Sequence, residues 1–216
     1  MKTNQISFIN NLEGTKLWLY SINKNNYIST KTEIEIAKSL SHNKSKRYLE
    51  SRALIRQSLS SIFNLDPLDI NIKSMPNRPI ILPPEMGYVN ISHCDDALII
   101  GWSISKIGID IERIDRDFNY EELAKRYLFK NSNVKNNKFT KLDVLNRWCG
   151  LESAIKWSEG SISQNIGDWI YYFNDQQLFN IEEKYYLQII QFYFREWTIS
   201  LTQKSFKKNF KPIICF

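Results

Sequence analysis

The chain has 216 residues, of which 43% are hydrophobic and 13% aromatic, enough for the core of one large domain or two small ones. Its 29 lysines and arginines against 23 acidic residues give a net charge of +6, which predicts an anionic partner such as nucleic acid, a phosphorylated cofactor or an acidic protein. Three widely separated cysteines exclude a disulfide framework and favour a reducing cytoplasm. We also expect no signal peptide and no membrane span, because no apolar run approaches about 20 residues.

In the first half of the chain, hydrophobic periodicity predicts one strand, two helices and then a run of strands. Because the last three of these strands follow one another closely, we expect them to form an antiparallel meander. The second helix has a basic N-terminal half, for which a solvated helix face is the ordinary interpretation. The expected elements are a strand at 17–22, helices at 32–40 and 45–63, and strands at 80–82, 88–93, 97–102 and 107–113.

The second half repeats this order of elements. An Asn/Lys-rich segment at 130–138 reads as a loop, and we expect it to be a docking surface for an acidic partner. We therefore predict an α+β fold with two similar halves, residues 1–104 and 105–216, each combining helices with a meander. The expected elements are helices at 120–129 and 143–157, strands at 169–173, 185–194 and 197–202, and a tail at 213–216 that can add a strand.

The strand expected at 107–113 alternates isoleucines with Gly108, Asp110 and Glu112. Since every second side chain of a strand lies on the same face, the two carboxylates lie on one face, roughly 7 Å apart. The ordinary interpretation is an acidic, solvent-exposed strand face. The alternative is a site for a hard divalent cation such as Mg²⁺, which selects carboxylate oxygens and leaves room for a substrate phosphate. The choice requires a third carboxylate and bases that bind phosphate.

The helix expected at 143–157 supplies one such carboxylate. Trp148, Glu152 and Lys156 recur every four residues and therefore share a helix face. Taken alone, Glu152 and Lys156 read as an ordinary surface ion pair, and Trp148 as a core residue. The segment at 108–112, followed about forty residues later by this one, is a more specific combination.

Together these segments resemble the two signatures of the 4′-phosphopantetheinyl transferases of the Sfp type. Residues 108–112 match the first signature in full, and Trp148, Glu152, Ser153 and Lys156 match the second. The second departs at Leu151, where the family usually has lysine. The segment Asn-Ile-Ser-His at 90–93 is similar to a strand of the family, Arg78-Pro79 to its basic turn, and Arg47 and Arg56 to the arginines of its first long helix.

The resemblance implies a pseudo-dimer of two α+β halves with the site in the cleft between them. It implies an enzyme that moves the 4′-phosphopantetheine arm of coenzyme A onto a serine of an acyl or peptidyl carrier protein and releases adenosine 3′,5′-bisphosphate. Mg²⁺ would be the cofactor. Such carrier proteins serve fatty acid synthesis or secondary metabolism, and we expect a cytoplasmic monomer.

The same resemblance assigns roles to seven residues. Asp110, Glu112 and Glu152 would hold the metal, and Glu152 would also take the proton of the carrier serine. Lys156 would pair with the phosphates and protonate the leaving group. Arg47, Arg78 and His93 would hold the 3′-phosphate and the pyrophosphate, for which the planar fork of arginine is well suited.

Two alternatives remain open on the sequence alone. Leu151 favours a catalytically impaired homologue that still binds coenzyme A or a carrier protein. The net charge favours a nucleic-acid-binding protein, but the basic residues are not interleaved with aromatic ones, so we expect no nucleic acid.

Ser92 and His93 are neighbours on a strand and would point to opposite faces, which argues against a nucleophile–base pair. Cys94 and Cys149 lack a base at fixed spacing, so we interpret them as structural.

Overall fold

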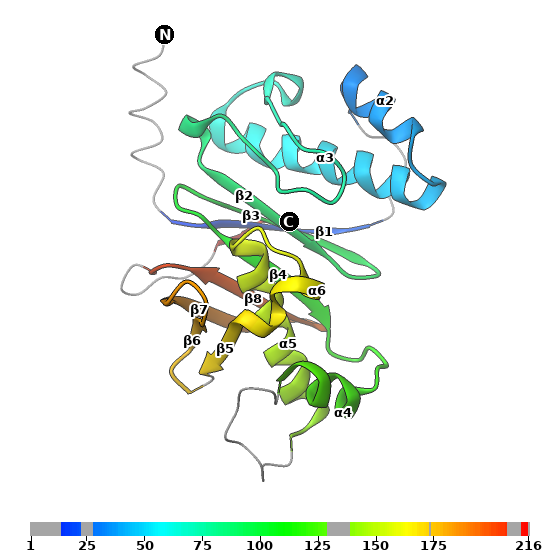
Figure 1. Ribbon diagram of the computed structural model, residues 1–216. Coiled ribbons are helices and arrows are strands. Elements are labelled where there is room, and N and C mark those ends of the chain that lie inside the picture. The colour runs from blue at the N-terminus through cyan, green and yellow to red at the C-terminus, as the bar shows by residue number, and fades with distance from the viewer. Residues whose placement is uncertain (1–13, 23–27, 129–138, 173, 207–212, 216) are drawn as a thin grey trace.

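The structure, a computed structural model, describes residues 14–22, 28–128, 139–172, 174–206 and 213–215. Within these ranges two sheets and several helices form a mixed α+β fold, which confirms the predicted class (Figure 1). The loop predicted at 130–138 lies outside the described residues. None of the helices in these ranges is both long and apolar enough to cross a lipid bilayer.

The first sheet has the strand order β2-β3-β1-β9 and is antiparallel except for the pair β1–β9. β1 pairs with β3 along its whole length, from Lys16 opposite Trp102 to Ser21 opposite Ala97. β9 comes from the far end of the sequence, so the last described segment extends a sheet built by the first hundred residues. The strands are β1 Lys16–Ser21, β2 Tyr88–His93, β3 Ala97–Ser103 and β9 Ile213–Cys215.

Two helices, α2 (Lys31–Lys38) and α3 (His42–Phe63), lie on one side of this sheet (Figure 1). α2 begins at a capping box in which Thr30 and Glu33 exchange side-chain and backbone hydrogen bonds. Glu33 also forms a buried ion pair with Arg56 of α3 at 3.0 Å, which fastens the two helices together. The apolar face of α3 packs on the sheet in a first core cluster, which includes Leu54, Ile55, Leu59, Trp18, Ile100 and Trp102.

The second sheet is antiparallel throughout, with the order β4-β8-β7-β6-β5. One face is covered by α5, which begins at a capping box of Thr140 and Asp143. α5 and this face share a core cluster that contains Leu151, Trp169 and Leu187. The elements are β4 Gly108–Arg113, α4 Tyr120–Leu123, α5 Lys141–Trp157, α6 Ile162–Asn165, β5 Trp169–Tyr172, β6 Gln177–Asn180, β7 Tyr185–Phe194 and β8 Trp197–Gln203.

The two sheets pack face to face and enclose a core cluster of their own. Along β1, Trp18 faces α3, while Leu17 and Leu19 face the second sheet, as the alternation of a strand requires. The molecule therefore has four layers: α3, the first sheet, the second sheet and α5. The cluster between the sheets comprises Leu17, Leu19, Ala97, Ile99, Ile107, Ile109, Ile111, Trp197, Ile199 and Leu201.

Both sheets are built by the same order of elements. With β9 left aside, each begins with one strand, continues through helices and ends with strands, the last of which pairs antiparallel with the first: β3 with β1, and β8 with β4. The boundary predicted at residue 104 lies in the link between β3 and β4.

The predicted meander is wrong. β2 and β3 form the expected hairpin, but β4 pairs with β8 in the other sheet. The reason is that the second edge of β3 is already occupied by β1, which arrives from the start of the chain. A pairing of this kind joins residues far apart in sequence, so local spacing gives no sign of it.

Three smaller predictions also need correction. The strand expected at 80–82 is only an isolated bridge between Ile81 and Lys73, because Pro79 and Pro83 flank it and have no amide hydrogen to donate. β6 was missed because its four residues are too few to show a period. The helix expected at 120–129 is the single turn α4 followed by a π-helical turn, Ala124–Leu128.

β4 and α5 approach so closely that Gly108 has no room for a side chain. A Cβ placed on Gly108 would lie 2.0 Å from the backbone oxygen of Ser153 and 2.8 Å from Cβ of Trp157. Small polar side chains of β8 line the same contact, and Thr198 Oγ1 donates a hydrogen bond of 2.9 Å to Asn146 Oδ1. This close approach brings the polar side chains of α5 next to β4.

We expect Gly108→Ala to lower the free energy of unfolding by about 3 kcal/mol, because the added methyl group must push α5 away from β4. Chemical denaturation measures this. Gly167→Ala is the matched control, since a Cβ on Gly167 meets no heavy atom within 4 Å. Equal stability of the two variants would contradict the close packing described above.

Candidate functional site

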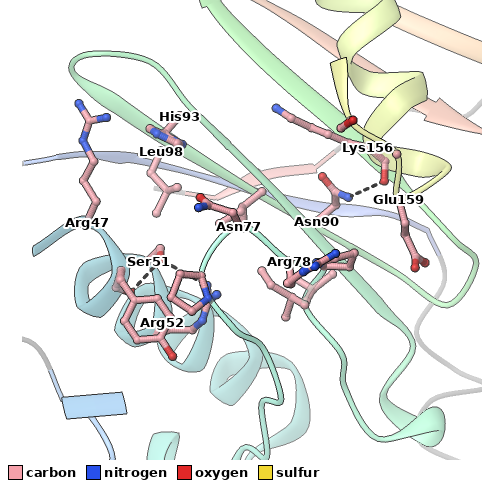
Figure 2. A pocket seen from close by; sticks show the side chains of 18 of the residues that line it. Arg47, Ser51, Arg52, Asn77, Arg78, Asn90, His93, Leu98, Lys156 and Glu159 are labelled. Atoms are coloured by element: carbon pink, nitrogen blue, oxygen red, sulfur yellow. Dashed lines mark hydrogen bonds between the residues drawn. The ribbon is translucent and has the colours of Figure 1, made fainter. Parts of the chain in front are cut away.

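A cavity of about 830 Å³ opens between the two halves of the molecule (Figure 2). One wall comes from α3, the turn at residues 76–80 and β2, and the other from the end of α5 and from α6. All four residues predicted to bind coenzyme A line it: Arg47, Arg78, His93 and Lys156. Arg47 and His93 lie together at one end, and Lys156 lies toward the other, beside Glu159 (Figure 2).

The cavity is positively charged and lacks enough carboxylates to balance its cations. Among the described residues, Arg47 and Arg78 form no salt bridge. Lys106, which also lines the cavity, pairs with Glu159 at 2.9 Å. The pKa of His93 is lowered, first by burial and then by the positive charges of Arg47 and Lys156. A neutral histidine beside cations that outnumber the carboxylates of the cavity fits a ligand that brings its own negative charge.

The turn that carries Arg78 is fixed by α3. Arg78 N–H donates to the backbone oxygen of Met75, and Asn77 adopts a left-handed conformation (φ 59°), which asparagine tolerates. Arg52 of α3 is buried and donates from Nη2 to Ser74 Oγ at 2.7 Å. The helix therefore positions both arginines: it carries Arg47 itself and holds the turn of Arg78 in place.

Behind one end of the cavity lies an ion-paired network built on Asp110. Lys156 Nζ donates to Asp110 Oδ1 and to Ser92 Oγ, both at 2.6 Å. Ser92 Oγ in turn donates to Asp110 Oδ1 at 2.7 Å. The three residues come from β2, β4 and α5, so this network joins the two halves at the cavity wall. The ordinary interpretation of this strand, a solvent-exposed acidic face, does not apply to Asp110, which is only 2% exposed.

Glu112 and Glu152 complete the acidic cluster. Glu152 Oε2 lies 3.8 Å from Lys156 Nζ, and Glu112 Oε2 lies 2.5 Å from Nη1 of Arg116. Burial and then the charge of Asp110 raise the pKa of both glutamates, that of Glu152 to about 8. Burial alone would lower the pKa of Lys156, but the charges of Asp110 and Glu152 outweigh it and raise the pKa.

The cluster as it stands is not a preformed metal site. No three His, Cys, Asp or Glu side chains in the described part of the chain are grouped so that they could hold an ion. Lys156 and Arg116 supply the positive charge instead. Their two charges do not balance three carboxylates. Asp110 Oδ2 is buried and accepts no hydrogen bond from an N–H or O–H group of the described residues, and the pKa of Glu152 is raised, so its charged form is disfavoured. The residues therefore fit an additional cation.

Three candidate nucleophiles near the site, Ser92, Cys94 and Cys149, are poorly suited to nucleophilic catalysis. Ser92 and His93 point to opposite faces of β2, as predicted: Ser92 contacts Asp110, and His93 lines the cavity. Ser92 with Lys156 resembles a nucleophile–base pair, but the raised pKa of Lys156 keeps it charged. Burial raises the pKa of Cys94 to about 11 and that of Cys149 well above its usual range, so both thiols stay protonated.

Three features of the site could not be recognised from the sequence. Ser92 was rejected as a nucleophile, and its contact with Asp110 depends on the packing of two sheets. Arg116 follows Glu112 by four residues, a spacing that predicts an ion pair only within a helix. Here Glu112 is in β4, and Arg116 lies in the link after that strand. Leu151 is 3% exposed and packs in the core cluster under α5, so its side chain does not border the carboxylates.

Comparison with known proteins adds no assignment: no protein-family model matches the chain, and no curated protein is significantly similar to it.

The raised pKa of Glu152 predicts a pH dependence of stability in metal-free protein. The folded state holds the proton up to about pH 8, whereas the unfolded chain releases it near the usual pKa of 4.5. The free energy of unfolding should therefore fall as the pH rises between these values. Glu152→Gln, which stays neutral, should remove this fall and gain on the order of 1–3 kcal/mol over the parent at pH 8.

Denaturation with a chelator present, at several pH values from 5 to 9, measures this difference. Glu182→Gln is the matched control, because Glu182 is exposed. A difference between Glu152→Gln and the parent that stays constant across this range would show that Glu152 ionises normally.

Proposed function

We propose that the chain transfers the 4′-phosphopantetheine arm of coenzyme A to a serine of an acyl or peptidyl carrier protein, with Mg²⁺ as cofactor. The observation that carries the proposal is the position of Lys156. This side chain lines the cavity that contains Arg47, Arg78 and His93, and it also binds the acidic cluster through Asp110. An anion in the cavity and a cation at the cluster would therefore be neighbours, as a metal–pyrophosphate complex requires.

The cavity suits coenzyme A in size and charge. Its volume of about 830 Å³ lies in the range of small-molecule sites. Coenzyme A carries a 3′-phosphate and a pyrophosphate. The guanidinium groups of Arg47 and Arg78, which form no salt bridge within the described part of the chain, can each bind a phosphate with two parallel hydrogen bonds. His93, on which the charges of both Arg47 and Lys156 act, would donate one further hydrogen bond to a phosphate oxygen.

The acidic cluster suits the cofactor. Asp110, Glu112 and Glu152 would hold the ion, and Oδ2 of Asp110, which accepts no hydrogen bond from an N–H or O–H group of the described residues, offers it one oxygen. When bound, magnesium would offset the negative charge that builds up on the pyrophosphate. The raised pKa values of both glutamates are the expected sign of carboxylates that lack positive charge.

The chain's residues then divide the work of the reaction. The serine oxygen of the carrier forms a bond to the phosphorus that bears the pantetheine arm, and the bond from this phosphorus to the bridging oxygen breaks. Glu152 takes the proton of the serine hydroxyl. Lys156 gives its proton to the departing adenosine 3′,5′-bisphosphate, or pairs with it.

The architecture proposed with this function is a pseudo-dimer of residues 1–104 and 105–216, with the site in the cleft between them. Its support is the shared connection order of the two sheets and the cavity between α3 and α5. We further propose a cytoplasmic monomer that takes no nucleic acid or membrane as a partner.

A catalytically impaired homologue remains the alternative, but its only support was Leu151. In the structure Leu151 belongs to the apolar cluster beneath α5, where a lysine would be buried. The residue therefore has a packing reason that is independent of catalysis.

Incubation with coenzyme A, Mg²⁺ and an apo-carrier protein, followed by mass spectrometry of the carrier, tests the proposal. We expect a gain of one phosphopantetheine arm, and a rate at least about 100-fold lower in Asp110→Asn and Glu152→Gln. These isosteric changes are preferable to alanine because Asp110 is buried and paired with Lys156. Unchanged mass of several different carriers would defeat the proposal, and a normal rate in either variant would remove that residue from the site.

Arg47→Gln and Arg78→Gln should each raise the KM for coenzyme A by roughly tenfold or more, because each loses a charged hydrogen-bond donor to phosphate. The kcat should change less, since neither side chain reaches the acidic cluster. Lys38→Gln is the matched control, as Lys38 is exposed and pairs with Glu35 on α2. Steady-state kinetics that leave KM unaltered in both arginine variants would place the coenzyme elsewhere.

A further inference from the structure

Arg116 is the least expected member of the acidic cluster. Its Nη1 lies 2.5 Å from Oε2 of Glu112, and its side chain is 38% exposed. Its positive charge also acts on Glu152, whose pKa it lowers against the larger effects of burial and of Asp110. Arg116 therefore faces two of the three carboxylates, from the link that follows β4, whereas Lys156 approaches from α5.

The position of Arg116 is supported on a second side. Its guanidinium group lies over the ring of Phe118, 5.0 Å from the ring centre. The backbone N–H of Arg116 donates to the oxygen of Arg113, which closes a turn directly after β4. A guanidinium group with a carboxylate on one side and an aromatic ring on the other is held more firmly than an exposed arginine on a flexible loop.

Arg116 and a divalent cation would compete for the same carboxylates of the cluster. A carboxylate that already neutralises a guanidinium group attracts a second cation less strongly. The two positive charges would also repel each other at a distance of a few ångströms, in a site that is largely shielded from water. Removal of Arg116 should therefore raise the affinity of the cluster for a divalent cation.

We propose that Arg116 is a built-in counter-ion that occupies Glu112 in the absence of metal and competes with the divalent cation for it. This inference rests on the proposed function, because it takes Glu112 as a metal ligand. Arg116 would weaken the affinity for the cation and so set the concentration of metal at which the enzyme becomes active. Its role is to tune the site, since it needs no contact with coenzyme A or the carrier.

Binding of Mn²⁺ to the full chain, measured by electron paramagnetic resonance of the free ion or by calorimetry, tests this directly. We expect Arg116→Gln to bind Mn²⁺ roughly tenfold more tightly than the parent, and Arg116→Lys to bind it about as the parent does, because the lysine keeps the positive charge. The half-saturating Mg²⁺ concentration for transfer should fall in parallel in Arg116→Gln.

Lys141→Gln is the matched control. Lys141 also lies over the ring of Phe118, at 5.5 Å, but its ion pair is with Asp117, at 4.0 Å. Lys141 is the first residue of α5, so its loss removes one positive charge from beside the same link, and the affinity for Mn²⁺ should stay unchanged. Asp110→Asn should abolish binding in the parent and in Arg116→Gln alike, which identifies the site that is measured.

The outcomes separate the two proposals. Equal or weaker Mn²⁺ binding by Arg116→Gln, with binding by the parent that Asp110→Asn abolishes, would overturn the counter-ion role and leave the metal site intact. Such a result would make Arg116 an ordinary surface ion pair or a structural support. Failure of the parent and of Arg116→Gln to bind Mn²⁺ at millimolar concentration would overturn the metal site, and the counter-ion role with it. Circular dichroism of each variant checks that it is folded.

Discussion

The hydrogen-bonded ion pair between Lys156 and Asp110 is the interaction on which the candidate site depends. It joins the last turn of α5 to the middle of β4, and Ser92 brings β2 into the same network. Asp110 is buried, so its charge requires this partner, and the loss of either one would leave an uncompensated charge inside the protein. The same contact sets the position of the cavity, because Lys156 forms part of its wall.

The contact depends on the close approach of α5 to β4. Gly108 on β4 leaves space for the backbone of α5. The small polar side chains of β8 form hydrogen bonds with polar side chains of α5, such as that of Thr198 with Asn146. On the opposite side of β4, Ile109 and Ile111 are held between the two sheets. β4 is therefore packed tightly on both faces, and the direction of its acidic side chains is fixed by packing on either side. A site positioned in this way is rigid before any ligand arrives.

The electrostatics of the cluster oppose stability. Three carboxylates share two nearby cations, one carboxylate oxygen has no partner, and Glu152 holds a proton near neutral pH. Replacement of such a group by apolar residues is often neutral or stabilising, so its presence needs a reason other than folding. The neighbouring cavity has the opposite imbalance, because its lysines and arginines outnumber its carboxylates among the described residues. An anion and a cation bound side by side would correct both.

Residue types and local spacing were enough to predict most of the elements, the α+β class and a group of candidate acidic residues, and the family resemblance added the candidate phosphate-binding residues. The alternation around Asp110 and the helical spacing of Glu152 and Lys156 are local patterns, which follow from the geometry of single strands and helices. The arginines at 47 and 78 were candidates only through the resemblance. Only the tertiary structure decided that β4 leaves the hairpin before it and pairs with β8, that β9 returns to β1, and that Asp110 is buried against Lys156. It also decided that Leu151 faces the core and that Arg116 lies on Glu112. Contacts of this kind join residues up to some two hundred positions apart or depend on which face of an element is covered, and neither property is encoded in the periodicity of a short segment.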